Sequence, residues 1–357
     1  MNIEKLMEKL PEGYEKTCYE TGAMKRAREI KRPRDLMMLA LSYVSQNFSL
    51  MEMSEIARLK GIGNISDVGF MKRFSKCNEW FVNILKQIEV EEVANYKKPE
   101  KLSKYKFKAI DASDVTSKGA VKSRYRLHYA INLFTMSSDE YKITNQKTGE
   151  SLTNFTIAPD DLVIADRGYG TKKSIEYCLE SKGDFILRIR NNPFKLYDES
   201  QEEVHIIDFL EGITEDEAKE VLVYMESSKK EKIPLRLCII KKPPETKENT
   251  SRIIKTYERT HQRKLSEETK RAHEYFFVLS SLPKELASAK EILEIYRLRW
   301  QVELYFKRLK SIMDFGDLPI KNEQSIKAWL SGKLIFALLI EKMIASVDFS
   351  PYGEAAE

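Results

Sequence analysis

The order of apolar and polar positions predicts helices along residues 1–95. An apolar run at residues 36–44 suits a buried helix, and residues 49–60 have helical periodicity. The pattern breaks at Gly61, and Ser66 is placed to cap a second short helix. Two helices around such a turn are typical of a helix-turn-helix, although a plain helical hairpin gives the same pattern.

After a polar linker at residues 96–104, the pattern changes to strands that alternate with helices. An apolar run at residues 162–165 fits a fully buried strand. We expect further strands at residues 107–111, 125–134, 141–145, 185–189 and 275–280, and helices at residues 171–181, 284–310 and 324–347. This alternation predicts an α/β fold in a domain that covers residues 105–345.

A charged segment at residues 196–275 interrupts the alternation. Fragments at residues 221–225, 235–240 and 252–257 have β-type sequences. Because the segment is too long for an ordinary connection, we expect a β-rich insertion with its own structure inside the larger domain.

Composition permits a sizeable core and points to a charged partner. Hydrophobic residues make up 42% of the chain, and the formal net charge is +5. Positive charge is concentrated at residues 24–34 and 96–126. Clustered basic segments suit a polyanion such as nucleic acid, and a solvated charged face is the alternative.

Cysteine and histidine usage argues against a zinc site. The chain has four cysteines and four histidines, and none of them has the spacing of metal ligands. The scattered cysteines and the charged N-terminus favour a reducing cytoplasm over secretion. No apolar run reaches the roughly 18 residues that a membrane-spanning helix needs, so we expect no membrane partner.

Two aspartates follow predicted strands. Asp111 ends the strand at residues 107–111, and Asp166 follows the apolar run at residues 162–165. Ligands of α/β sheets bind at the carboxyl ends of the strands. A carboxylate in apolar surroundings is costly unless a partner such as a metal ion compensates its charge. For each aspartate alone, a turn or a helix cap is the alternative interpretation.

The predicted helix at residues 284–310 carries a polar stripe. Tyr296, Arg299, Glu303 and Lys310 fall within about 60° of one another around a continuous helix. A neighbouring apolar stripe contains Ile295, Leu298, Val302, Phe306 and Leu309. The apolar stripe would dock the helix on the sheet and leave the polar stripe at the edge of the buried face. A solvated face with a Glu303–Arg299 ion pair is the alternative.

The spacing Tyr296-x2-Arg299-x3-Glu303-x6-Lys310 resembles the YREK signature of the DDE transposases of bacterial insertion sequences. The resemblance extends to IDAS at 110–113, DRGY at 166–169 and VLSSLP at 278–283. It implies a ribonuclease-H-like core with a β-rich insertion at residues 196–275 and a helical DNA-binding region at residues 1–95.

The resemblance also implies a role for each residue of the motifs. As in the family, the catalytic carboxylates would hold two Mg²⁺ or Mn²⁺ ions, and these metal ligands are Asp111, Asp166 and Glu303. The residues that would bind DNA phosphates near the scissile bond are Tyr296, Arg299 and Lys310.

The implied partners are double-stranded DNA, at the transposon ends and at the target, and a second copy of the chain in a homodimer on DNA. The implied place of action is the cytoplasm, at the nucleoid. We also expect the insertion to clamp the cleaved DNA end through its basic runs and aromatic residues, which are Lys229, Lys230, Lys241, Lys242, Tyr224 and Tyr257. Because the chain ends soon after Glu303, a truncated DNA-binding relative without full transposition activity is one alternative. Another two-metal nuclease, such as a resolvase, is a second.

Overall fold

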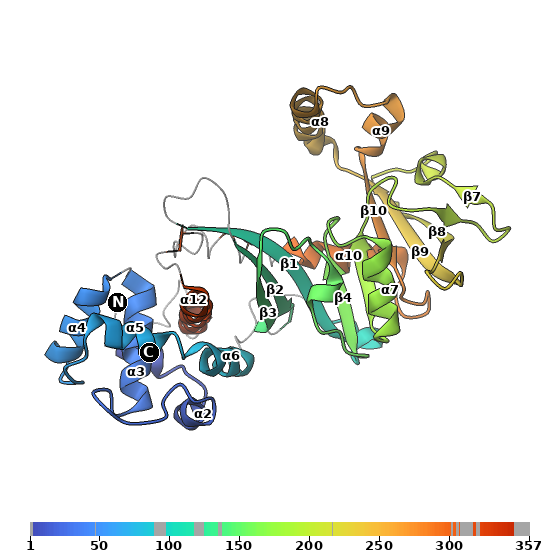
Figure 1. Cartoon of the computed structure of the whole chain (residues 1–357). Helices are drawn as coiled ribbons and strands as arrows, with labels where there is room; N and C mark the ends of the chain where they lie inside the picture. Colours follow the sequence, from blue (N-terminus) through green and yellow to red (C-terminus); the bar gives the residue numbers. More distant parts are fainter. Residues whose placement is uncertain are drawn as a thin grey trace, which may run out of the picture. The chain divides into compact units, whose positions relative to one another are not determined.

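The computed structural model describes residues 3–46, 48–88, 98–117, 125–134, 138–215, 217–300, 303–304, 307, 317–318 and 322–345 (Figure 1). The chain forms two compact units, each assembled from segments far apart in the sequence. The helix-rich unit comprises Met1–Tyr96, Ala112–Thr148 and Glu303–Glu357, and the sheet unit comprises Lys97–Asp111 and Gly149–Val302. None of the described helices combines the length and the apolar character of a membrane span.

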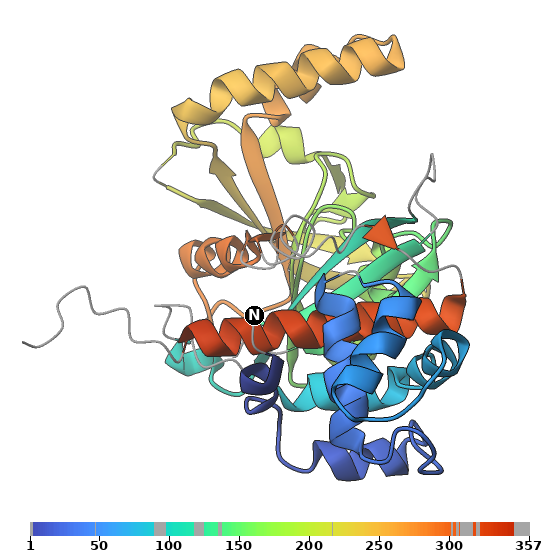
Figure 2. The same cartoon turned by 90° about the vertical axis from the view of Figure 1, so that its left-hand side faces the viewer.

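The helix-rich unit contains helices in the regions predicted at residues 36–44, 49–60, 66–74 and 324–347, together with helices that the sequence pattern did not place individually. They are α1 (Ile3–Met7), α2 (Tyr14–Glu20), α3 (Pro33–Gln46), α4 (Leu50–Leu59), α5 (Asp67–Phe74), α6 (Asn78–Gln87) and α12 (Glu323–Ala345). The predicted cap at Ser66 is confirmed, because its Oγ accepts a hydrogen bond from the Gly69 amide at 3.1 Å. Figure 2 shows α12, in red, running past the N-terminal helices, and it contacts α3 and α6.

The contact between α12 and the N-terminal helices is close and apolar, with one polar tie. A Cβ atom on Gly332 would lie only 3.0 Å from Val44 Cγ1 of α3. The hydroxyl of Ser331, which is fully buried, donates to Asn78 Oδ1 of α6 at 2.9 Å and also hydrogen-bonds to Tyr141. Because buried polar groups are costly without partners, this network fixes the position of α12 within its unit.

The same unit contains an antiparallel hairpin of β2 (Tyr125–Asn132) and β3 (Ser138–Asn145). Both strands were expected from the sequence, and both are confirmed. The far end of β1 (Lys106–Ser117), which enters this unit after Asp111, pairs in parallel with β11 (Asp317–Leu318).

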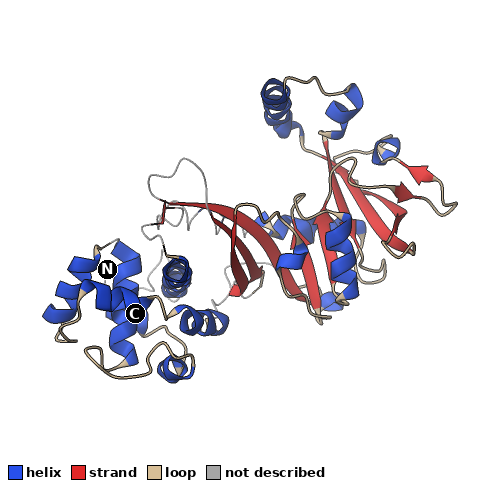
Figure 3. Ribbon diagram, viewed as in Figure 1, coloured by secondary structure: helices blue, strands red, loops and turns tan. Residues whose placement is uncertain are grey.

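A continuous sheet forms the other unit, with strand order β1-β4-β5-β10-β9-β8-β6-β7 (Figure 3). The first strands are β1, β4 (Asp161–Ala165) and β5 (Asp184–Arg188), which are parallel. The others, antiparallel to their neighbours, are β10 (Tyr275–Ser280), β9 (Lys232–Lys241), β8 (Lys219–Glu226), β6 (Leu196–Tyr197) and β7 (Glu203–Val204). All five residues of β4 are buried, as the apolar run predicted. A mixed α/β fold with a large, mostly antiparallel sheet is therefore confirmed.

The segment at residues 196–275 combines strands with helices. The β-type fragments at residues 221–225 and 235–240 lie in β8 and β9, as predicted. The prediction of β structure at residues 252–257 is wrong, because they lie inside α8 (Lys247–His261). Six residues are too few to distinguish the two periods, and the polar residues on both sides extend the helix. A second helix, α9 (Glu267–Ala272), precedes β10.

The helix expected at residues 284–310 differs from the observed α10 (Ala289–Leu298). It begins later than predicted, because Ser288 and Glu291 form a capping box that starts the helix at Ala289. Arg299 is its C-cap. Residues 301–302, 305–306 and 308–316 lie outside the described part of the chain, so continuation of the helix there stays a prediction.

Candidate active site and nucleic-acid interface

Asp111 and Asp166 occupy equivalent positions on neighbouring parallel strands. The register of β1 with β4 ends at the pair Ile110 and Ala165, and each aspartate is the next residue. Neighbouring strands lie about 4.8 Å apart, so the two acids leave the sheet side by side. One detail of the prediction is wrong: β1 does not end at Asp111 but continues to Ser117, and only its pairing with β4 stops there.

Two donors converge on the carboxylate of Asp166. The Tyr296 hydroxyl donates to Oδ1 at 3.1 Å, and Arg188 Nη1 lies 3.4 Å from the same oxygen. Burial alone would raise the pKa of Asp166, but the charges of Arg299 and Arg188 and the donated hydrogen bonds hold that pKa below its ordinary value. Asp166 is therefore ionised at neutral pH, as a metal ligand must be.

Tyr296 acts as a hydrogen-bond donor because it keeps its proton. Burial, and then the charge of Asp166, raise the pKa of Tyr296 to about 12. The hydroxyl is positioned by α10, whose buried Ile292 and Ile295 face the core of the sheet unit. Ile295 and Leu298 of the predicted apolar stripe are buried, and its other three members lie outside the described residues.

Arg299 lies beside both aspartates at the C-terminal end of α10. Its Nη1 is 3.9 Å from Asp111 Oδ2, and its guanidinium carbon is 5.8 Å from the centre of the Tyr296 ring. Burial disfavours the charged form, but Tyr296 and the two aspartates outweigh it and raise the pKa of Arg299. A cation at this end of a helix is also favoured by the helix dipole.

The loop after β4 depends on a glycine that lets it approach β5. A Cβ atom on Gly170 would lie 2.4 Å from the carbonyl oxygen of Arg188, a contact that no side chain tolerates. Thr171 then caps α7 (Lys172–Glu180) by accepting a hydrogen bond from the Ser174 amide. Position 170, directly after the DRGY motif, therefore needs a glycine. The loop passes close to the backbone of Arg188, whose side chain contacts Asp166.

Arg188 was not among the residues expected from the sequence. The available signal was a charged residue near the end of the predicted strand at 185–189, at the same sheet edge as the two aspartates. In an apolar strand such a charge indicates an ionic partner, but the sequence did not identify Asp166 as that partner.

The two remaining predicted site residues fall in the segment of the chain that belongs to the helix-rich unit. Glu303 is an exposed helical residue of the helix-rich unit, and Lys310 lies outside the described residues. Among the residues that the structure describes, no group of three or more His, Cys, Asp or Glu side chains is arranged to hold a metal ion. The assignment of a complete carboxylate triad, and of its metal ions, stays a prediction.

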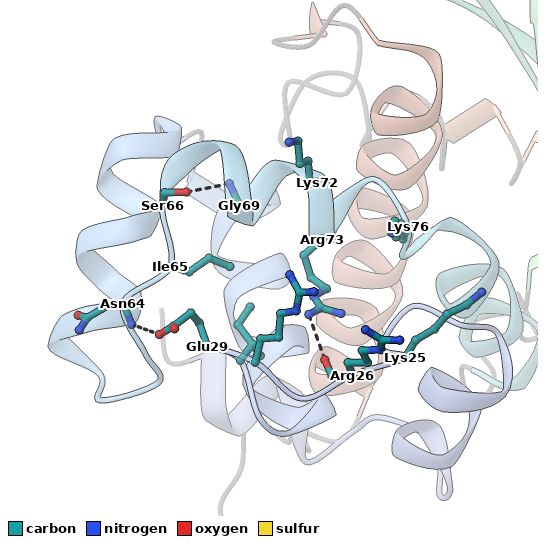
Figure 4. Close-up of a pocket in the computed structure, with 12 residues that line it drawn as sticks. Lys25, Arg26, Glu29, Asn64, Ile65, Ser66, Gly69, Lys72, Arg73 and Lys76 are labelled. Atoms are coloured by element: carbon teal, nitrogen blue, oxygen red, sulfur yellow. Dashed lines mark hydrogen bonds between the residues drawn. The ribbon is translucent and has the colours of Figure 1, made fainter.

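A second candidate site lies among the N-terminal helices. A cavity of about 500 Å³ brings the basic segment at residues 24–34 against α5 and the turn before it (Figure 4). We call it the N-terminal basic cavity, and its charged residues are Lys25, Arg26, Arg28, Glu29, Lys72, Arg73 and Lys76. Six cations against one acid make it strongly positive, which suits a phosphate backbone.

Specific contacts hold the basic segment in place. Figure 4 shows Arg73 beside Arg26, to whose carbonyl oxygen it donates at 3.2 Å. Glu29 accepts a hydrogen bond from the Asn64 amide at 3.0 Å. A Cβ atom on Gly63 would lie 2.4 Å from the Glu29 carbonyl oxygen, so the turn can approach the basic segment only with glycine there. The one acid of the cavity is thus used in folding.

Comparison with known proteins agrees with the motifs. The family "Transposase DDE domain" matches residues 102–339. The chain is 29% identical to InsL from insertion sequence element IS186A of Escherichia coli K12, over 97% of this chain and 95% of that relative. It is also 29% identical to the transposase for insertion sequence element IS421 of Escherichia coli, with the same coverage. The transposase for IS231F of Bacillus thuringiensis subsp. israelensis is 24% identical over 55% of this chain and 44% of its own length. Because the family match covers more than half of the chain, the chain belongs to the DDE-domain transposases.

Proposed function

We propose that this chain is an insertion-sequence transposase that binds the ends of its element and catalyses DNA cleavage and strand transfer. The observation that carries the proposal is the placement of Asp111 and Asp166 on neighbouring parallel strands, with Tyr296 and Arg299 beside them. A parallel β1-β4-β5 centre with acids at its carboxyl edge is compatible with a ribonuclease-H-like core.

We propose that Asp111, Asp166 and Glu303 hold two Mg²⁺ or Mn²⁺ ions during the reaction. Carboxylate oxygens are the hard ligands that these ions prefer, and the nearby cations keep Asp166 ionised and ready to bind them. When bound, such ions activate the attacking oxygen and stabilise the leaving oxygen of a phosphoryl transfer.

The protein's own residues would orient the DNA. Tyr296 and Arg299 lie at the aspartates, where a hydroxyl donor and a guanidinium can hold the phosphate next to the scissile bond. Lys310, seven residues beyond Glu303, is proposed to add a further charge to the same strand. Because phosphoryl transfer needs no protein nucleophile, positioning and charge account for the chemistry.

Binding of the transposon end is proposed to use residues 1–95. The N-terminal basic cavity supports this, because its cations flank α5, the second helix of the predicted helix-turn-helix. A homodimer on DNA would bring two such regions to the two ends of the element, in the cytoplasm at the nucleoid. The alternative, a relative that binds DNA without full transposition, differs from this proposal in lacking catalysis.

The test is a strand-transfer assay with purified protein, a duplex carrying the element's end and a supercoiled target plasmid. We expect end cleavage and joined product only with Mg²⁺ or Mn²⁺, and neither with Asp166→Asn, which should still bind the end. Cleavage without joining would favour a simple nuclease such as a resolvase. Binding without any cleavage would favour the truncated relative.

A further inference from the structure

The sheet unit contains a second basic cavity, formed where the insertion meets the strands that lead to the active site. It has a volume of about 370 Å³, and we call it the insertion cavity. Its cationic side chains are Arg167, Arg188, Arg190 and Lys242, and the imidazole of His273 also lines it. None of the residues that line it is an aspartate or a glutamate.

The cations of the insertion cavity are held close to one another. The Arg188 guanidinium carbon and Lys242 Nζ lie 5.0 and 5.1 Å from the centre of the Phe276 ring. The Lys242 ammonium also donates to the carbonyl oxygen of His273 at 2.5 Å. Cation–π contacts and this hydrogen bond hold the two cations in place, and Arg188 also pairs with Asp166.

The positive charges of the cavity lower the pKa values of two of its groups. Burial, and then the charges of Arg188 and Arg167, lower the pKa of Lys242 to about 8. Burial and Lys242 likewise lower the pKa of His273. Like charges that depress one another in this way are stabilised when an anion enters.

Two exposed apolar side chains of α8 also line the insertion cavity. Ile253 and Tyr257, one helical turn apart, line the cavity, and 53% and 43% of their surfaces are exposed. Cationic and exposed apolar side chains in one cavity match a nucleotide, whose phosphate is charged and whose sugar and base have apolar faces.

We propose that the insertion cavity binds a phosphate group of the DNA strand, as a subsite next to the proposed metal ligands. The proposal rests on the proposed function, since it takes DNA as the substrate. Arg188 links the two sites, because it lines the cavity and also contacts Asp166 at 3.4 Å. A phosphate in the cavity would therefore be fixed one side chain away from the catalytic carboxylates.

The experiment compares two double variants of the full chain that remove equal charge. The cavity variant, Arg190→Gln with Lys242→Gln, removes two cations from the cavity. The α8 variant, Lys255→Gln with Arg259→Gln, removes two exposed cations of α8 that do not line the cavity. Arg190→Gln alone serves if the Lys242 substitution impairs folding, because Arg190 is exposed. The probes are inorganic phosphate, followed by calorimetry, and a fluorescent end duplex, followed by anisotropy in EDTA over a range of salt concentrations.

We expect the cavity variant to lose about tenfold in phosphate affinity, as for a lost charge-assisted hydrogen bond. Its log–log salt slope for DNA should fall by about 0.9 more than that of the α8 variant, as for one lost phosphate contact. Equal losses in both variants, or no phosphate binding by the wild type, would overturn the proposal. If phosphate affinity falls but the salt slope of DNA binding is unchanged in the cavity variant, the cavity binds free phosphate and the proposal is also overturned. None of these measurements needs catalysis, so a chain that fails to cleave DNA would contradict the proposed function alone.

Discussion

At the scale of single residues, most of the described contacts of the site converge on Asp166. Its position could be predicted, because an apolar run of four residues fits a buried strand and the acid follows it directly. The link to Tyr296, 130 positions away, was expected only from the family's motif, and Arg188 was missed altogether. Spacing along one helix reveals a shared face, but it does not reveal which side chain on another strand meets that face.

Removing the Tyr296 hydroxyl should destabilise the ionised form of Asp166 relative to the protonated form. In Tyr296→Phe we expect the pKa of Asp166 to rise, since the hydroxyl that donates a hydrogen bond to the ionised carboxylate is removed. Because the pKa of Asp166 is lowered in the folded chain, its ionised carboxylate stabilises the fold at pH values above the pKa of the unfolded state. This stability is lost as the pH falls through the pKa of the folded state. The variant should thus lose that stability at a higher pH than the wild type.

Carboxyl-carbon NMR measures this titration directly. Tyr177→Phe is the control, because that hydroxyl donates elsewhere, to the Phe155 carbonyl oxygen at 2.8 Å. If Asp166 titrates identically in the wild type and in Tyr296→Phe, the hydrogen bond does not stabilise the carboxylate.

At the scale of elements, the strands of the sheet were easier to predict than the helices around them. Runs such as those of β4 and β5 are short, apolar and bounded by turn residues, so both their type and their bounds are readable. α8 was mistaken for a strand because the fragment at residues 252–257 is too short to reveal the helical period, although Ile253 and Tyr257 lie one helical turn apart. The start of α10 was overlooked although Ser288 and Glu291 have the spacing of a capping box.

The loop between β4 and α7 gives the prediction at this scale. Gly170→Ala places a methyl group 2.4 Å from the Arg188 carbonyl oxygen, so the loop or β5 must move. We expect a loss of about 1–3 kcal/mol in the free energy of unfolding, as for other overpacked sites. Urea unfolding measures the loss, and Gly149→Ala is the matched control because a Cβ atom there meets nothing within 4 Å. Equal stability of the two variants would show that the close approach is not needed.

At the scale of the whole molecule, the compact units do not follow the order of the chain. The helix-rich unit joins the first helices to α12, and it also contains the β2–β3 hairpin. The sequence predicted each of these elements but not their grouping, because an apolar helix face does not identify its partner. The predicted boundaries at residues 95, 105 and 345, and those of the insertion at 196 and 275, remain predictions.

This grouping predicts the behaviour of a truncated chain. A fragment that lacks residues 1–96 should aggregate, because it uncovers the surface of α12 that packs against α3 and α6, where Gly332 lies close to Val44 and Phe81. Co-expression of residues 1–96 as a separate polypeptide should restore solubility by covering that face. Size-exclusion chromatography decides, and a monomeric fragment that unfolds cooperatively on its own would contradict the grouping.

The most direct test of the account's central claim counts the Mn²⁺ ions that the chain binds on DNA. Electron paramagnetic resonance with an end duplex should give two ions per wild-type chain, as a two-metal carboxylate site requires. Asp111→Asn, Asp166→Asn and Glu303→Gln should each lose at least one ion and abolish cleavage, while Glu199→Gln, a change at an exposed acid outside the triad, should lose neither. If Glu303→Gln keeps both ions and still cleaves the duplex, Glu303 is not a metal ligand and the proposed triad is wrong.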